Sequence, residues 1–153
     1  MSEQDPGQLP TIATTNEGFV GISFPTNELL TTLTNYALSS GINALNKSNS
    51  FEPLVIRVLD NDEMSLHKYK SSKTGPEEAV KSIDSLPNNV KAYALVLTIL
   101  YKQEHDAIFV EVGERGQEEG YQFVQKYKPK GFLSAFARVD LPIFLGKIPQ
   151  KLK

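Results

Sequence analysis

One stretch restricts the fold of this chain more than any other: residues 91–101, KAYALVLTILY, are almost uninterruptedly apolar. The stretch is too short for a helix that crosses a membrane, which needs about 20 apolar residues. Turn-forming sequences flank it, Pro87-Asn88-Asn89 before and Lys102-Gln103-Glu104 after. A short apolar run between turns is typical of a strand that is covered on both faces. The stretch therefore predicts a central strand with other structure packed on each side of it.

Three more strands are expected after this central strand. They span residues 106–112, 121–128 and 133–139, and with 91–101 they predict a four-stranded antiparallel meander. Proline has no N–H to give to a sheet. Pro142 and Pro149 therefore indicate that the remaining segment is an edge strand or an extended wrap.

Earlier in the chain, residues 54–60 and 64–70 flank the turn Asn61-Asp62 and predict a hairpin. Residues 18–24 suit a short strand. Two segments have helical periodicity. The first runs from about residue 29 to residue 46, with Thr26 or Asn27 as its cap. The second is short and begins at Pro76, which suits a first helical turn.

The expected fold class is therefore α+β. Its antiparallel sheet consists of a C-terminal four-stranded meander plus an N-terminal hairpin, and one long and one short helix pack on it. Residues 1–17 are polar and contain two prolines, so we expect a disordered lead. Residues 18–153 are expected to form a single α+β domain.

Composition limits the possible kinds of protein. Hydrophobic residues make up 40% of the 153-residue chain and charged residues 22%, as in ordinary globular proteins. No apolar window is long enough for membrane insertion, and the first residues lack the pattern of a signal peptide. The chain has no cysteine, which excludes disulfides, thiolate catalysis and cysteine-ligated metals. We expect a soluble, cytoplasmic protein.

Glu111 is the one carboxylate within the strand expected at 106–112. Both faces of that strand look buried, and an ionised carboxylate in apolar surroundings needs a partner. The strands expected at 106–112, 121–128 and 133–139 are neighbours. If their polar side chains point to the same face of the sheet, these side chains meet Glu111 in a pocket that is lined by aromatic residues. This candidate ligand pocket consists of Glu111, Gln125, Tyr127 and Arg138. The alternatives are an internal ion pair between Glu111 and Arg138, a position at the sheet margin, or a solvent-facing Glu111.

The loop after Glu111 is rich in glycine and charge. Gly113 and Gly116 bracket Glu114 and Arg115, an arrangement that can expose backbone amides to an anion. The surrounding carboxylates would repel a phosphate, so a solvated hairpin loop is the simpler interpretation. We regard the loop as a candidate interaction loop, formed by Glu114, Arg115, Glu118 and Glu119.

Neither a metal nor a cofactor is predicted. His67 and His105 are the only histidines, and the sequence assigns them to separate hairpins. The serine-hydrolase elbow G-x-S-x-G is absent.

Charge is distributed unevenly along the chain. Residues 1–125 carry 17 of the 18 acidic and 9 of the 16 basic side chains, a balance of −8, whereas residues 126–153 have a balance of +6. The basic segment can contact phosphates or fold back on the acidic body. We do not expect nucleic-acid binding, because the cations lack a recognised motif.

The long helix has no charged residue between Glu28 and Lys47. Leu38 and Ile42 fall outside its main apolar face, which suggests cover on two sides. The second cover is either the protein's own chain or a second subunit, so a homodimer through the helix Leu29–Leu45 is possible.

Three functions remain open. The first is a non-catalytic interaction or adaptor protein, and it is preferred because no catalytic motif is complete. The alternative is a small-ligand binder or enzyme with a polar pocket around Glu111. The third is a binder of anionic surfaces or nucleic acid through the basic C-terminal segment.

Overall fold

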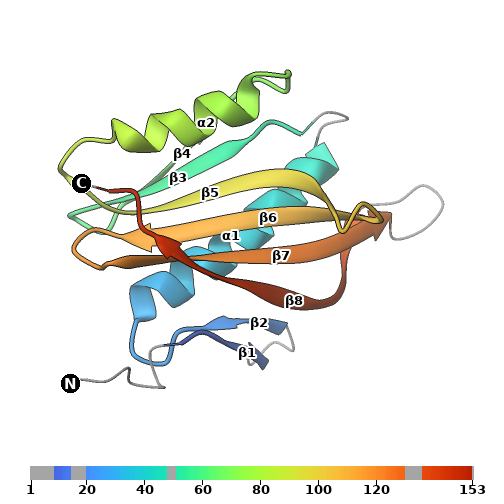
Figure 1. Ribbon diagram of the computed structural model, residues 1–153, viewed down its shortest axis with the longest axis horizontal. Coiled ribbons are helices and arrows are strands. Elements are labelled where there is room, and N and C mark those ends of the chain that lie inside the picture. The colour runs from blue at the N-terminus through green and yellow to red at the C-terminus, as the bar shows by residue number, and fades with distance from the viewer. Residues whose placement is uncertain (1–8, 15–19, 48–50, 130–135, 153) are drawn as a thin grey trace.

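The computed structural model describes residues 9–14, 20–47, 51–129 and 136–152. A six-stranded antiparallel sheet forms its centre, with the strand order β4-β3-β5-β6-β7-β8, and a separate hairpin pairs β1 with β2 (Figure 1). The elements are β1 Thr11–Thr14, β2 Val20–Ser23, α1 Glu28–Lys47, β3 Leu54–Leu59, β4 Met64–Lys68, α2 Gly75–Asp84, β5 Val90–Tyr101, β6 His105–Glu114, β7 Glu119–Pro129 and β8 Phe136–Pro149. The expected α+β fold class, with its meander, hairpin and two helices, is confirmed.

The first part of β5, residues 90–96, is covered on both faces as its apolar run predicts, whereas residues 97–101 are half-buried or exposed, with Leu100 57% exposed. Ala94 and Val96 belong to the apolar cluster under α1, and Tyr93 and Leu95 belong to the cluster under α2. Figure 1 shows α1 crossing one face of the sheet and α2 lying near β3 and β4. The sheet is thus the middle layer of the domain, and side chains of β5 reach both outer layers.

Helix α1 packs closely on the sheet at Gly41. A Cβ atom at this position would lie 2.8 Å from Ile108 Cδ1 and 3.2 Å from Val96 Cγ1, so only glycine allows this approach. Leu38 is fully buried and Ile42 packs against the same cluster. The protein's own domain therefore covers both residues. A homodimer through this helix stays a prediction.

The start of α1 is capped as expected, because the Asn27 side chain accepts a hydrogen bond of 3.0 Å from the Leu30 N–H. Further along α1, Asn35 holds the hairpin by two hydrogen bonds of 2.8 Å to the backbone N–H and carbonyl of Ile22. This anchors β2, with which β1 pairs.

Strand β1 corrects the expectation of a disordered lead. Thr11–Thr14 forms a strand, although the sequence around it is polar. Pairing with β2 supplies the backbone hydrogen bonds that local sequence propensity does not predict. Residues 1–8 and 15–17 of the expected lead lie outside the described residues, and the single-domain assignment of 18–153 stays a prediction.

No helix among the described residues has both the length and the apolar character that crossing a membrane requires.

A buried hydroxyl in α1 gives a test of the packing. Thr34 is fully buried, and its Oγ1 has no hydrogen-bond partner among the described residues. Thr34→Val removes the unsatisfied group at nearly constant shape, so the free energy of unfolding should rise by about 1 kcal/mol. Urea denaturation measures this change. Thr32→Val, at an exposed position of the same helix, is the control for helix propensity. An equal effect of both substitutions would contradict the interpretation.

Candidate functional site

Glu111 lies in the middle of the sheet and is only 2% exposed. It is on β6, directly opposite Leu95 of β5 and Gln122 of β7. Residues that face one another across antiparallel strands point to the same face. Glu111 therefore points to the face that carries α2, as Leu95 and Tyr93 do.

Three side chains bind the Glu111 carboxylate. The Tyr93 hydroxyl donates to Oε2 at 2.8 Å, and the Gln122 amide donates to Oε1 at 3.2 Å. Lys151 Nζ donates to Oε2 at 2.5 Å and forms an ion pair with it. The buried charge thus has a counter-ion and two neutral hydrogen-bond donors, which is what a carboxylate in apolar surroundings requires.

Burial, followed by the charge and hydrogen bond of Glu111, raises the pKa of Tyr93 above its ordinary value of 10.0. The phenol is neutral at physiological pH and donates its proton to the carboxylate. It therefore acts as a fixed hydrogen-bond donor.

The counter-ion comes from the segment after β8. Figure 1 shows this segment turning from the end of β8 across the sheet toward α2. The Gln150 N–H donates to the Glu118 carbonyl at 3.2 Å, and Leu152 packs into the cluster that contains Ala79 and Ile83 of α2. We call residues 150–152 the C-terminal strap.

Two glycines make room for the strap. A Cβ atom on Gly113 would lie 2.6 Å from the Tyr93 ring and 3.0 Å from Gln150 Cβ. A Cβ atom on Gly120 would lie 2.8 Å from the Val112 carbonyl oxygen and 3.5 Å from Gln150 Cα. Of the two glycines that the sequence associates with an anion-binding loop, Gly113 therefore lies where the strap crosses the sheet, whereas a Cβ atom on Gly116 would meet no atom within 4 Å.

The expected convergence of Glu111 with Gln125 and Arg138 does not occur. Gln125 lies opposite Ile108, which packs under α1, so Gln125 is on the opposite face from Glu111. Its amide donates to the carbonyls of Lys126 and Val139, at 3.1 and 3.2 Å. An ion pair of Glu111 with Arg138 is likewise wrong, because the cation is Lys151.

Tyr127 and Arg138 are opposite each other on β7 and β8, also on the α1 face. The Arg138 guanidinium donates to Ser39 Oγ of α1 at 3.3 Å. Burial lowers the pKa of Arg138 and raises that of Tyr127, whose pKa the charge of Asp106 raises further. The two residues lie between the sheet and α1. The Glu111 carboxylate is on the other face of the sheet.

Most charges of the candidate interaction loop have partners within the protein. Arg115 Nε donates to the Val90 carbonyl at 2.9 Å, and its Nη2 donates to the Pro87 carbonyl at 3.1 Å. Glu114 accepts a hydrogen bond of 2.7 Å from Asn27, and Glu119 pairs with Lys147 at 3.1 Å. Glu118 is exposed. The Arg115 side chain thus joins this hairpin to the first residue of β5 and to the turn before it.

The basic C-terminal segment is partly folded back on the acidic body. Lys147 and Lys151 pair with Glu119 and Glu111, as one of the two interpretations of the charge asymmetry expects. Lys130 and Lys153 lie outside the described residues.

The two histidines are far apart in the sheet, one on β4 and the other at the start of β6. His67 contacts the Arg57 guanidinium, and burial together with that charge lowers the pKa of His67. His105 is 3.7 Å from Glu104. Across the described ranges, no three metal-ligating side chains form a cluster.

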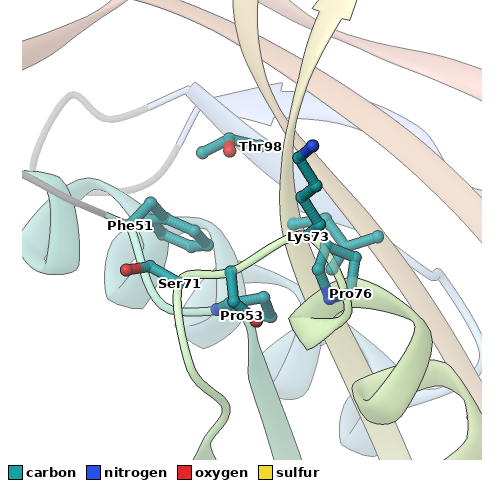
Figure 2. Close-up of a pocket in the computed structure, with 8 residues that line it drawn as sticks. Phe51, Pro53, Ser71, Lys73, Pro76 and Thr98 are labelled. Atoms are coloured by element: carbon teal, nitrogen blue, oxygen red, sulfur yellow. The ribbon is translucent and has the colours of Figure 1, made fainter.

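The described surface has several open depressions. One of about 280 Å³ lies between the start of α2 and β5, and Figure 2 shows the six labelled side chains that surround it. Its hydroxyl groups and its lysine are exposed, so it lacks a buried polar anchor for a ligand. A second, of about 210 Å³, is a groove between α1 and β4. A third, of about 460 Å³, lies beside the C-terminal strap.

Comparisons of the chain with protein-family models, with curated proteins and with solved structures gave no match.

The Glu111–Lys151 pair can be tested by Glu111→Gln. Neutralising Glu111 removes the charge that Lys151 pairs with, although the partly exposed Lys151 can turn to water. The free energy of unfolding should therefore fall by about 1.5–3 kcal/mol, the usual contribution of a hydrogen bond to a charged group. Glu119→Gln breaks an exposed pair and should cost less than about 1 kcal/mol. If urea denaturation gives equal losses of unfolding free energy for Glu111→Gln and Glu119→Gln, burial of the Glu111 pair does not contribute to stability.

Tyr93 predicts a loss of stability at alkaline pH. Above about pH 10 the unfolded chain releases the Tyr93 proton while the folded protein retains it, so stability falls as pH rises. In Tyr93→Phe this fall should be shallower by about 1.4 kcal/mol per pH unit. Urea denaturation at several alkaline pH values measures the slope. Tyr36→Phe is the control, because Tyr36 is 45% exposed. If the unfolding free energy of Tyr93→Phe falls with pH as steeply as that of the parent protein, the prediction is wrong.

Proposed function

We propose that this protein is a non-catalytic interaction protein that binds an extended, acidic segment of a partner protein along the edge of β4. The observation that carries the proposal is an open strand edge beside a groove with two lysines. The mode of binding is strand addition, in which main-chain hydrogen bonds supply affinity and alternate side chains supply specificity.

The backbone of β4 is oriented for this role. The Tyr69 N–H donates to the Pro53 carbonyl, and the Leu59 N–H donates to the Glu63 carbonyl, each at 2.8 Å. Hydrogen-bonded and non-hydrogen-bonded pairs alternate along an antiparallel ladder. Met64, Leu66 and Lys68 fall on the non-hydrogen-bonded pairs of this register. Their N–H and carbonyl groups therefore point away from β3, toward the open edge.

The opposite edge of the sheet is less suitable for a partner strand. Strand β8 contains Pro142 and ends at Pro149, and neither residue has an N–H to donate. The β1–β2 hairpin also lies beside β8 (Figure 1). Strand β4 contains no proline. It has only five residues, and a short edge strand discourages unselective pairing with other chains.

The groove between α1 and β4 indicates the chemistry of the partner. Leu66 and Lys68 form one side, and Tyr36 and Lys47 lie on the α1 side, with no carboxylate among the lining residues. Tyr36 is 45% exposed and Leu66 is 36% exposed. A strand added to β4 would direct every second side chain toward α1. An apolar side chain suits Tyr36 and Leu66, and neighbouring carboxylates suit the two lysines.

The polar groups that suggest chemistry in the sequence support a non-catalytic role. Glu111 and Arg115 have internal partners, and the latter holds two backbone carbonyls. Exposed apolar groups at a sheet edge are a better basis for function than side chains that are already bound.

The proposal is tested with Leu66→Pro and Leu66→Ala. Proline removes an N–H that points outward and leaves the β3–β4 ladder intact, whereas alanine removes the side chain and keeps the N–H. Peptides selected for binding from a random displayed library should be acidic, with alternating apolar residues. Leu66→Pro should weaken their binding at least about tenfold, and Leu66→Ala should weaken it less.

Circular dichroism first establishes that both variants are folded. In NMR titrations, the amides of residues 64, 66 and 68 should shift most. Selected peptides that bind Leu66→Pro as tightly as the parent would overturn the proposal, as would peptides without acidic enrichment.

A further inference from the structure

We infer that Tyr93, Glu111 and Gln122 form a binding site for a primary ammonium group, which the protein's own Lys151 fills. The strap is a displaceable occupant of this site. The inference is independent of the proposed partner site at β4, which lies at the far edge of the sheet.

The site is built without help from its occupant. The Tyr93 hydroxyl holds Oε2 and the Gln122 amide holds Oε1, so two neutral donors from β5 and β7 orient the carboxylate. Tyr93 is fully buried and Glu111 is 2% exposed. These residues belong to the central strands of the sheet and keep their places when the strap moves. The carboxylate therefore remains aimed at the position of the Lys151 ammonium.

The occupant is more exposed to solvent than the site. The Lys151 side chain is 29% exposed, against 3% for the Glu111 side chain. The strap follows Pro149, which ends β8, and the Gln150 N–H extends the β7–β8 pairing by one hydrogen bond to the Glu118 carbonyl. Its described attachments include the Gln150–Glu118 backbone hydrogen bond, a backbone hydrogen bond of Lys151 with the Tyr93 hydroxyl, the ion pair, the approach of Gln150 to Gly113 and Gly120, and the Leu152 side chain.

Solvent reaches the site from the cleft of about 460 Å³ beside the strap, which Asp84 and Gln122 line together with the strap residues. When Lys151 withdraws, the carboxylates of Glu111 and Asp84 remain on this side of the sheet. A buried carboxylate without a counter-ion is strongly unfavourable. The vacated site therefore selects a cation.

The geometry favours a primary ammonium group over other cations. An ammonium is compact and has three N–H donors, which suits the single position at Oε2 that Lys151 occupies. A guanidinium is broad and planar and prefers both carboxylate oxygens, but Gln122 already binds Oε1. A quaternary ammonium has no N–H to donate. The ligand is thus a small primary amine or a lysine side chain of another polypeptide.

Rescue of Lys151→Ala by n-propylammonium tests this inference, because that ion replaces the three carbons and the nitrogen that the substitution removes. When the concentration of n-propylammonium is about ten times its dissociation constant, binding raises the ratio of folded to unfolded protein about elevenfold. The melting temperature of Lys151→Ala should then rise by roughly 3–6 °C. The same ion should have no such effect on the parent, whose site is filled. If Lys151→Ala is unfolded without the amine, recovery of its circular dichroism is the readout.

Three controls separate the site from general salt effects. Tetramethylammonium chloride at equal concentration should not rescue Lys151→Ala. The double variant Glu111→Gln/Lys151→Ala should not respond to n-propylammonium, and neither should Lys147→Ala, which loses only an exposed ion pair. Equal responses to both ions, or rescue of the double variant, would overturn the inference.

A peptide with the strap sequence Pro-Gln-Lys-Leu distinguishes the two sources of the amine. If a lysine in a polypeptide is the natural ligand, this peptide should rescue the double variant Lys151→Ala/Leu152→Ala at least about tenfold more efficiently than n-propylammonium does, because that variant leaves the Leu152 position in the α2 cluster vacant for the peptide's leucine. If a small amine is the ligand, the two midpoints should agree within about threefold. Failure of both probes would overturn the inference.

Discussion

The burial of residues 90–96 of β5 on both faces is the constraint on which the rest of the structure depends. Its side chains alternate between two apolar clusters, so each face of the sheet needs a covering layer. The 20-residue helix α1 covers one face. The 10-residue helix α2 packs beside β3 and β5 on the other face, and the cluster beneath it also contains Leu152. The C-terminal strap is therefore part of the second layer.

The same constraint explains the chemistry around Glu111. A carboxylate on a strand that is covered on both sides is shielded from solvent, and the Glu111 side chain is only 3% exposed. The charge therefore needs ligands within the second layer, and these are a phenol, an amide and an ammonium. The strap contributes an apolar contact through Leu152 and a positive charge through Lys151, which lie next to each other in sequence.

Much of the fold could be predicted from the sequence because it depends on local periodicity. Alternation of side chains places Ile108 and Glu111 on opposite faces of β6, and helical spacing outlines α1. The same rules do not determine which residue of the next strand lies opposite. The register of β6 with β7 pairs Ile108 with Gln125, so Gln125 joins the α1 face and the expected pocket is divided between two layers.

The strap and β1 escaped prediction for a related reason. After Pro149 the chain has no periodicity that places Lys151 beside Glu111, and the pairing spans 40 residues. Strand β1 depends on β2, which is anchored by Asn35 of α1. Two signals for the strap are nevertheless present in the sequence. They are Leu152 within a basic segment and the glycines at 113 and 120, where larger residues would block its path.

The separation of Glu111 from its cation also has a consequence for the order of folding. An intermediate that has assembled β5 and β6 alone holds the Glu111 carboxylate without Lys151. Such an intermediate must keep the second face of the sheet hydrated, since dehydrating an unpaired charge is costly. Drying of this face is thus coupled to the arrival of β7, β8 and the strap. A single charge on a central strand thereby discourages premature collapse of a half-formed sheet.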